Sequence, residues 1–315
     1  MWWRFIVSRI LKFSLTLLLI SFLIAVMVRM IPGDPASRML GRAATPEQVA
    51  LLRHRMGLDQ PILIQYLKWL QGVLQGRMGE SYRLGIPVNE LVLERYPRTL
   101  SCVFLGTIIS LIVSLTAGII SARKANTWFD FTVTSISLLG VSMPSFLTGI
   151  ILIYIFSVKL GWLPTSGWVH PTENFWEYIK HLLMPATTLG LAVGAIMTRM
   201  VRATLLEVLY ENYIIVARAK GLEERLVLLR HALRNTLIPV VTAFGIQMGY
   251  MLGGSVVIED VFTFPGVGQL VVTSIMGRDY ILVQAGVLAY AMTFMAINFV
   301  TDISYGFLDP RVRVG

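Results

Sequence analysis

Long apolar runs alternate with short polar stretches along most of this chain. Six runs reach about 20 residues, the length that an α-helix needs to cross the hydrocarbon core of a bilayer. They cover residues 10–31, 99–122, 131–158, 182–200, 237–258 and 280–303. The first run follows basic residues, as in a signal peptide, but it is long and no small-residue cleavage site follows it. We therefore expect an all-α membrane protein with six transmembrane helices.

The polar segment between the first two predicted spans has helical order of its own. Thr45 is placed as a helix N-cap, with Pro46 in the first turn and Gln48 positioned to close a capping box. That helix is expected to end at Gly57. We therefore predict an extracytoplasmic helical insertion over residues 32–98.

Two further helices are expected in the insertion. One covers about residues 62–74, and glycines at 76, 79 and 85 break the chain after it. The other covers residues 88–96, whose apolar positions recur at helical spacing, so we expect it to lie on the outer membrane face. The insertion could shield the helix bundle or offer a docking surface, and the sequence leaves both open.

Composition supports the membrane assignment and narrows the chemistry. Of 315 residues, 55% are hydrophobic and 14% charged, with a mean hydropathy of +0.69. A soluble domain carries about 25% charged residues. The single cysteine, Cys102, excludes an internal disulfide and a multi-cysteine metal site. The net charge of +9 does not indicate nucleic-acid binding, because the sequence contains no basic soluble domain with interleaved aromatic residues.

The basic residues instead predict orientation. With the N-terminus in the cytoplasm, fourteen Lys and Arg residues fall in cytoplasmic pieces and three in short outer loops. This asymmetry places both termini in the cytoplasm. The predicted organisation is an N-terminus and first span at 1–31, the insertion at 32–98, and a five-helix core at 99–315 with a cytoplasmic loop at about 201–236.

Signatures of catalysis and ion coupling are missing. The dipeptide Gly-Lys does not occur, so the chain has no phosphate-binding loop of the Gly-x4-Gly-Lys type, and the four histidines form no His-Glu-x-x-His pair. The predicted spans carry almost no charge, whereas ion-driven carriers keep ionisable side chains inside the bilayer. We therefore expect no catalytic residues, no bound metal and no cofactor in this chain.

Small residues and one proline mark positions where helices could pack closely or bend. Glycines four apart, as at Gly190 and Gly194, let helix backbones approach each other. Pro144 should kink the third span. Such residues could serve static packing alone or line a path for a solute. The candidate pathway residues are Ser142, Pro144, Gly249, Gly253, Gly254 and Ser255.

The loop between the fourth and fifth spans predicts a helix–glycine–helix elbow. Small residues precede Gly221, and the leucines after it, at 222, 226, 229 and 233, recur on one helical face. The elbow could lie on the membrane surface, but this composition favours insertion into a groove of a partner protein. The elbow residues singled out are Tyr213, Ala217, Arg218, Ala219, Lys220, Gly221, Leu222, Leu226, His231, Arg234 and Asn235.

Two smaller features lie on the outer side. The acidic pair Glu259-Asp260 at the outer end of the fifth span is expected to end that span in water, although it could meet a cationic solute or a partner. The aromatic residues Trp162, Trp168, Trp176 and Tyr178 are expected to form an interfacial belt.

Four motifs together resemble the permeases of binding-protein-dependent ABC importers, in the dipeptide, oligopeptide and nickel branch. In chain order they are RMIPGDP at 29–35, GLDQP at 57–61, ARAKG at 217–221 continuing through HALRN at 231–235 to Pro239, and EDVFTFPGVG at 259–268. The broader importer signature opens with Glu-Ala-Ala, where this chain has Ile215, Val216 and Ala217, and this variation resembles the same branch.

The resemblance implies a type I importer permease in the inner membrane of a bacterium. It implies four partners besides the lipid bilayer: a second similar permease, two cytoplasmic ATPase subunits that use ATP and Mg, and an extracytoplasmic solute-binding protein. The stretch from Tyr213 to Asn235 matches the family's coupling loop, which lies in a groove on the ATPase.

The expected function is ATP-driven import by alternating access, with dipeptides or oligopeptides as the preferred substrates. The same family also imports nickel or metal chelates and glutathione, and these stay open as alternatives. An ion-coupled secondary carrier and a structural scaffold are more distant alternatives.

Overall fold

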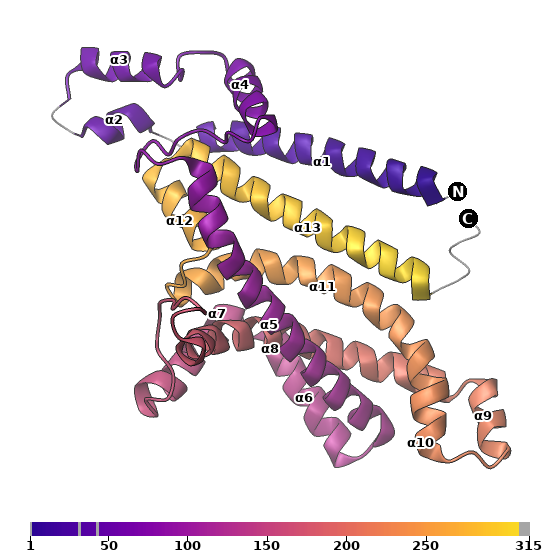
Figure 1. The fold of residues 1–315 in the computed structure, drawn as a ribbon. Coiled ribbons are helices and arrows are strands. Elements are labelled where there is room, and N and C mark those ends of the chain that lie inside the picture. Colours follow the sequence, from indigo (N-terminus) through magenta and orange to yellow (C-terminus); the bar gives the residue numbers. More distant parts are fainter. Residues whose placement is uncertain (1, 31–32, 42–43, 309–315) are drawn as a thin grey trace. The chain divides into compact units, whose positions relative to one another are not determined.

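The protein is described by a computed structural model, which covers residues 2–30, 33–41 and 44–308 and the side chains of these except at 2–6, 38 and 302–308. Within those ranges the regular structure is helical, apart from one isolated bridge between Glu80 and Pro87 (Figure 1). Five helices are long and apolar enough to cross a membrane. They are α1 (Trp2–Met30), α5 (Val88–Arg123), α8 (Phe175–Leu209), α11 (Leu233–Val261, extended at its start by shorter helical segments) and α13 (Tyr280–Leu308).

The sixth candidate span is broken. Helix α6 (Trp128–Ser142) is followed after two residues by α7 (Ser145–Leu152) and the π-helix η1 (Ile153–Lys159), at an angle of 105°. Pro144 stands at the break, directly before α7, where its missing N–H costs no helical hydrogen bond. The all-α fold with six predicted spans is confirmed, and the expected kink is a sharp bend.

Contacts divide the chain into two compact units. One comprises Met1–Leu100 with Pro265–Met295, and the other Ser101–Phe264 with Ala296–Gly315. Helices α5 and α13 each continue from one unit into the other.

The first unit contains the insertion, built from α2 (Pro35–Leu40), α3 (Pro46–Arg55) and α4 (Ile62–Leu74). The predicted capping box is present: the Gln48 N–H donates to Thr45 Oγ1 at 3.3 Å, and the Thr45 N–H donates to Gln48 Oε1 at 3.0 Å. Gly57 follows this helix with a φ of +68°, a conformation that favours glycine. Local sequence signals therefore predicted these helix ends correctly.

Helix α4 packs against α1 and α13 in the first unit. The hydroxyl groups of Tyr66 and Ser21 are 2.8 Å apart, and Tyr66, Trp69, Ala25 and Leu288 form one buried cluster. The loop after α4 is tied to the start of α13, because the Ser81 hydroxyl donates to a carboxylate oxygen of Asp279. The insertion is thus packed against membrane helices as well as against itself.

The expectation of a separate helix at 88–96 is wrong. Those residues form the first turns of α5, which runs unbroken to Arg123 with Pro97 inside it. Val88 and Val92 are buried against Leu270 and Leu282, so their apolar face packs on α12 (Val267–Gly277) and α13. The amphipathic pattern was real, but another helix covers it rather than the membrane surface.

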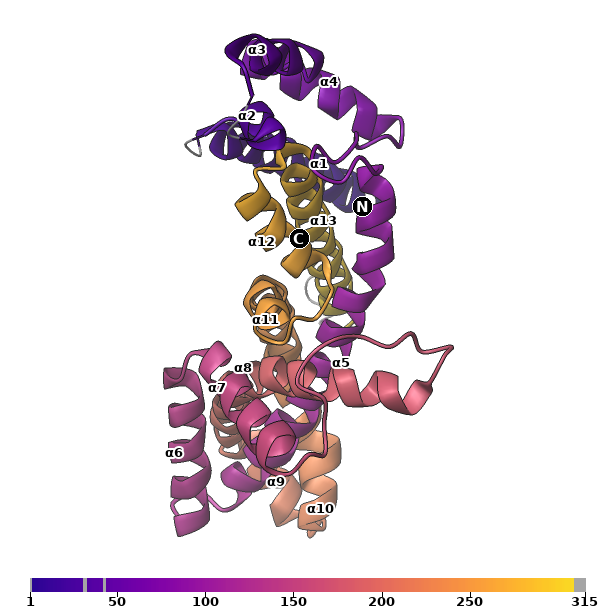
Figure 2. The same ribbon diagram turned by 90° about the vertical axis from the view of Figure 1, so that its left-hand side faces the viewer.

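In the second unit, α5 and α8 approach each other through small residues. A Cβ atom added at Gly190 would lie 2.8 Å from the carbonyl oxygen of Gly106, and one at Gly118 would lie 2.8 Å from Val201. Lipid tails are as apolar as helix surfaces, so close backbone packing has to hold such helices together. The spacing of small residues therefore serves packing here, while α6 and α7 pack on α8 in the same unit (Figure 2).

We predict that Gly190→Ala destabilises the protein, because the new methyl group meets backbone that cannot move without separating α5 from α8. The expected loss in unfolding free energy is about 1–2 kcal/mol, the cost of overpacking less the gain in helix propensity. Gly194→Ala is the matched control one turn away, where the nearest atom is at 3.4 Å. Denaturant titration of the purified variants measures both, and equal stability of the two would contradict the packing argument.

Candidate functional site

The predicted elbow is present between α8 and α11 (Figure 1). It consists of α9 (Asn212–Ala219), a turn at Gly221, the single-turn helix α10 (Glu224–Leu226) and the π-helix η2 (Val227–Ala232). Gly221 has a φ of +78°, and its N–H donates to the Arg218 carbonyl at 2.9 Å. A Cβ atom added at Gly221 would have no atom within 4 Å. The backbone conformation therefore favours glycine at this turn, whereas the space around it does not.

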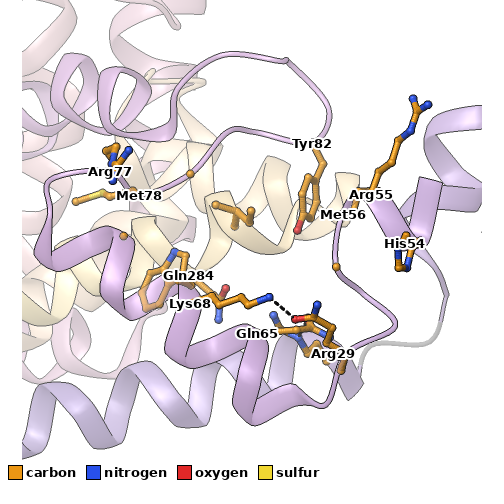
Figure 3. A pocket seen from close by; sticks show the side chains of 16 residues that line it. Arg29, His54, Arg55, Met56, Gln65, Lys68, Arg77, Met78, Tyr82 and Gln284 are labelled. Carbon is orange, nitrogen blue, oxygen red and sulfur yellow. Dashed lines mark hydrogen bonds between the residues drawn. The ribbon is translucent and has the colours of Figure 1, made fainter. Parts of the chain in front are cut away.

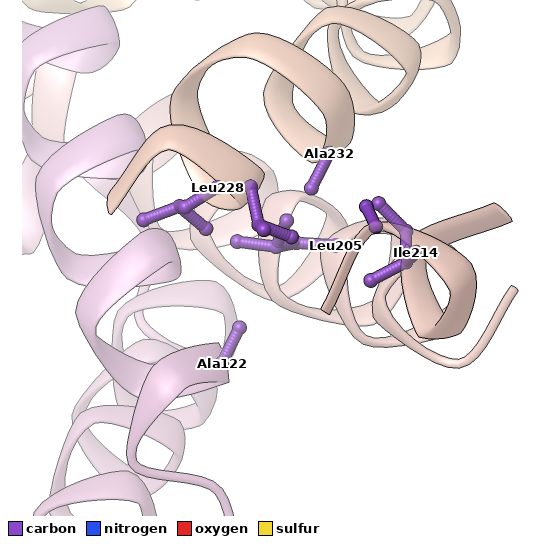
Figure 4. Close-up of a cluster of buried hydrophobic side chains, with 7 residues drawn as sticks. Ala122, Leu205, Ile214, Leu228 and Ala232 are labelled. Atoms are coloured by element: carbon purple, nitrogen blue, oxygen red, sulfur yellow. The ribbon is translucent and has the colours of Figure 1, made fainter. Parts of the chain in front are cut away.

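The inner side of the elbow is an apolar cluster (Figure 4). Its buried members are Ala122 of α5, Leu205 of α8, Ile214 and Ala217 of α9, and Val227, Leu228 and Ala232 of η2. Leu205 and Ile214 are completely buried. The cluster joins both arms of the elbow to the ends of α5 and α8.

Two polar ties close the elbow from outside. The guanidinium group of Arg218 donates to both carboxylate oxygens of Glu224, at 2.7 and 3.0 Å, across the Gly221 turn. This hydrogen bonding raises the pKa of Arg218. The Asn235 amide donates to the Tyr213 hydroxyl at 2.7 Å and links the first arm to α11. The elbow is therefore a closed loop whose two arms are held together.

The surface of the elbow that faces away from the apolar cluster combines exposed apolar and basic residues. Leu229 is 54% exposed and Leu226 is 40% exposed, while the buried positions are Val227, Leu228 and Ala232. Two residues of the predicted leucine face, Leu226 and Leu229, are therefore exposed, whereas Leu222 packs against the cluster. Besides Arg218, which is paired with Glu224, the exposed cations are Lys220, Arg225, Arg230 and Arg234. Such a surface suits contact with a partner protein.

A buried ion pair next to the elbow was missed by the sequence analysis. Arg202 of α8 binds both carboxylate oxygens of Asp130 in the first turn of α6, at 2.5 and 2.6 Å. Ser121 donates to the same carboxylate at 2.5 Å, and the Asn126 N–H donates to it at 3.0 Å. Asp130 is the sole acidic residue between Glu94 and Glu173, which is a signal that the sequence did contain.

The candidate pathway residues lie in two places in the second unit. Ser142 and Pro144 are exposed at the break between α6 and α7, where the Ser142 hydroxyl donates to the Leu138 carbonyl. The others lie on α11, which packs against α7. Gly253 and Gly254 are helical there, with open space beside Gly253, and Ser255 is buried. Their role in a solute pathway stays a prediction.

A cavity of about 470 Å³ lies among α5, α6, α7 and α8. Its lining is largely apolar and includes Met143 and Thr148 beside the break, but none of the six candidate pathway residues. Within the described part of the chain, no group of three or more His, Cys, Asp or Glu side chains is placed to hold a metal ion. This cavity therefore offers shape and apolar surface but little polar recognition.

The two residues of the acidic pair at the end of the fifth span differ in burial. Asp260 is exposed as expected, but Glu259 is fully buried, so the expectation that both end the span in water is wrong for Glu259. The turn that follows folds back, because the Phe264 N–H donates to the Glu259 carbonyl at 2.7 Å. Phe262 and Phe264 of this turn are buried, and the Glu259 side chain is buried with them.

Only some residues of the predicted aromatic belt are exposed at the surface. Trp162 and Trp176 are 64% and 73% exposed. Trp168 instead packs edge-on against Phe264 and Tyr178, with ring centroids 5.3 and 5.1 Å apart. Trp168 and Tyr178 therefore hold the loop between η1 and α8 against the turn after α11.

Comparison with known proteins identifies the class to which this architecture belongs. Residues 114–314 match the family described as binding-protein-dependent transport system inner membrane component, and residues 2–103 match the N-terminal domain of the same family. The chain belongs to this family and is an inner-membrane permease of the ABC importer type. The resemblance based on four sequence motifs is confirmed.

Relatives and solved structures agree with this assignment. The glutathione transport system permease proteins GsiC of Escherichia coli K12 and Salmonella paratyphi A are each 40% identical over 310 residues, covering 98% of this chain and 99% of theirs. An inward-facing structure of the MetNI methionine ABC transporter matches with a TM-score of 0.60 and 19% identity, over 70% of this chain and 96% of that one. An amino acid ABC transporter structure matches with a TM-score of 0.54 and 14% identity, over 69% and 93%. At these identities the structures support the fold alone.

We predict that Asp130→Asn destabilises the second unit, because it leaves Arg202 without its carboxylate. Hydrogen bonds to a charged group are worth roughly 1.5–3 kcal/mol, and a loss at the lower end is expected because Arg202 is partly exposed. The unfolding midpoint of the purified protein measures the change. Asp260→Asn, at an exposed acidic residue, is the control. A midpoint for Asp130→Asn as high as that of the control would show that the pair does not hold α6 to α8.

Proposed function

We propose that this permease imports short peptides and that glutathione, a tripeptide, is the first substrate to test. The supporting observation is the 40% identity with glutathione permeases along nearly the whole of both chains. The resemblance of the four sequence motifs to the dipeptide, oligopeptide and nickel branch also favours short peptides as substrates. The same family includes importers of nickel and metal chelates, and these are the alternative outcome of the test.

The proposed assembly has this chain beside a second, similar permease. Two ATPase subunits bind on the cytoplasmic side, and a solute-binding protein delivers the substrate outside. ATP and Mg are bound by the ATPase subunits, and this chain contributes no catalytic residue. The lack of a Gly-Lys phosphate loop agrees with this division of labour.

The proposed orientation places both termini in the cytoplasm, which puts the elbow on the ATPase side. The exposed Leu226 and Leu229 then enter a groove on the ATPase, with the cations of the elbow around them. The residues proposed for this contact are those of the predicted coupling loop, from Tyr213 to Asn235. The contact would join an apolar centre to a charged rim, as is usual at protein interfaces.

The proposed mechanism is alternating access. Closure of the ATPase pair on ATP moves the elbow, and the apolar cluster of Ala122, Leu205 and Ile214 carries this movement to the ends of α5 and α8. The break at Pro144 lets α6 and α7 move as separate segments. Hydrolysis and release of the products then return the permease to its resting state.

Gly221→Val tests the elbow. A β-branched residue is strongly disfavoured at a φ of +78°, so the turn should be distorted and ATP-driven uptake should fall by at least about tenfold, with normal membrane insertion. Gly221→Asn is the matched control, because asparagine tolerates this conformation and the site has room for it. Uptake is measured in proteoliposomes that contain all partner subunits. Normal uptake by the valine variant would remove the elbow from the mechanism.

The substrate is tested in the same proteoliposomes by supplying radiolabelled glutathione, a dipeptide mixture or Ni²⁺ with the solute-binding protein. We expect ATP-dependent accumulation of glutathione or a dipeptide and none of Ni²⁺. Accumulation of Ni²⁺ alone would overturn the peptide proposal but leave the importer class intact. Uphill transport by this chain alone, driven by an ion gradient, would overturn the class.

A further inference from the structure

A second cavity, of about 460 Å³, lies in the first unit (Figure 3). Its walls come from the last turn of α1, the end of α3, helix α4, the loop that follows α4, and the start of α13. None of its residues belongs to the elbow or to the candidate pathway. The cavity is therefore a feature that the proposed transport mechanism does not use.

The lining is strongly basic. Arg29, Arg55, Lys68 and Arg77 are among the sixteen lining residues, and no aspartate or glutamate is among those that the structure describes. Of the four, Arg29 is the most enclosed. Its guanidinium group donates to Gln65 Oε1 at 2.9 Å and to the Ala25 carbonyl at 2.6 Å, which fixes its position at the wall. Arg55 points away from the cavity (Figure 3), so Arg29, Lys68 and Arg77 supply its positive potential. The Asp59 carboxylate, 2.6 Å from Nδ1 of the lining His54, offsets this potential in part.

Two buried donors in the wall lack partners. Trp69 is 9% exposed and Gln284 is 1% exposed, and both line the cavity. Within the described structure, neither the Trp69 indole Nε1 nor the Gln284 amide Nε2 has a hydrogen-bond partner. Buried donors are nearly always paired in folded proteins. These two therefore point to an acceptor that the described part of the chain does not supply.

Tyr82 adds a further donor on the opposite wall. Burial raises the pKa of Tyr82 to about 12, while Arg29 opposes this rise and Asp279 adds to it. The phenol hence keeps its proton at physiological pH. Lys68 uses one of its three N–H groups on Gln60, at 2.8 Å, and has two left. Neutral and charged donors thus surround the cavity from several elements.

We propose that this cavity is a binding site for an oxyanion, a phosphate or carboxylate group, held by Lys68 and Arg77 and by the buried donors of Trp69 and Gln284. Negatively charged oxygens accept several hydrogen bonds at once, and charge-assisted bonds are the strongest that such donors form. A cationic or purely apolar ligand would leave both the positive charge and the unpaired donors uncompensated.

The oxyanion can come from two sources. Arg29 is in the last turn of the first candidate span, at the level where basic side chains meet lipid headgroups, so a phospholipid phosphate is one source. A soluble anion on the outer side of the membrane is the other. Both present the same chemistry to the wall, and the experiment separates them.

The test uses the purified full-length chain, freed of lipid in detergent micelles. Inorganic phosphate and acetate are the soluble probes, and phosphatidylglycerol in mixed micelles is the lipid probe. Binding is measured by calorimetric titration and by the shift in unfolding temperature. The variants Gln284→Leu and Trp69→Phe each remove one buried donor; the first keeps nearly the same volume, and the second keeps an aromatic ring but is smaller. Arg83→Gln is the control, since Arg83 is a cation of the same loop outside the cavity lining.

We expect at least one probe to bind the wild-type chain and to bind each donor variant about tenfold more weakly. Arg83→Gln should stay within about twofold of the wild type. Without any probe, Gln284→Leu should unfold at the same or a higher temperature, because it replaces an unpaired buried amide by an apolar side chain. This comparison separates lost binding from lost folding.

The outcomes are decisive in both directions. Binding of phosphatidylglycerol alone identifies a lipid headgroup, and binding of phosphate or acetate identifies a soluble oxyanion. The proposal is overturned if no probe binds, or if Gln284→Leu and Trp69→Phe both bind as tightly as the wild type. Transport is not measured, so neither result depends on the proposed import function.

Discussion

Close backbone contact between α5 and α8 is the constraint on which the second unit depends. Inside a bilayer, apolar side chains gain nothing by leaving lipid for another helix, so association must come from packing. Gly106, Gly118 and Gly190 supply that packing where the two helices meet. The elbow cluster then sits on the ends of these same helices, through Ala122 and Leu205. In the proposed mechanism, this close packing of the helices under the elbow is what lets a movement of the elbow reach the rest of the second unit.

Charge reinforces this arrangement at one point. The Asp130–Arg202 pair ties α6 to α8, and the Ser121 hydroxyl in its hydrogen-bond network is the neighbour of Ala122 in the elbow cluster. The carboxylate also lies in the first turn of α6, where the helix dipole favours negative charge. Apolar packing and the ion pair thus join α5, α6, α8 and the elbow at one end of the second unit.

The sequence predicted the features that are set locally. Apolar run length located the spans, the Thr45 capping box and the glycine at 221 fixed helix ends and a turn, and Pro144 marked the bend. What it could not predict depends on pairing between distant residues. Val88 is buried by α12 and α13, which begin 179 and 192 residues later, and Asp130 meets a partner 72 residues away. The cavity is lined by residues as far apart in the sequence as Arg29 and Gln284, so no local sequence pattern could predict it.

Only part of the leucine face predicted for the elbow is exposed, because Leu222 packs against the apolar cluster while Leu226 and Leu229 do not. An ideal helix would bring positions 222, 226, 229 and 233 together, but the π-helical turn at Val227–Ala232 changes the register. As a result Val227 and Leu228 are buried, and Leu226 and Leu229 stay exposed. The exposed leucines are the part of the elbow that is free to meet a partner.

The central claim is that separate ATPase subunits move this chain through its elbow, and site-specific cross-linking measures this most directly. The single natural cysteine, Cys102, is buried, so Cys102→Ser gives a background for introducing Leu229→Cys. The control is Thr172→Cys, in the loop before α8 that the proposed orientation places outside. In the assembled complex, Leu229→Cys should cross-link to the ATPase with an efficiency that changes when ATP is added, and Thr172→Cys should not cross-link to it. Failure of Leu229→Cys to cross-link, in a complex that still transports, would contradict the claim.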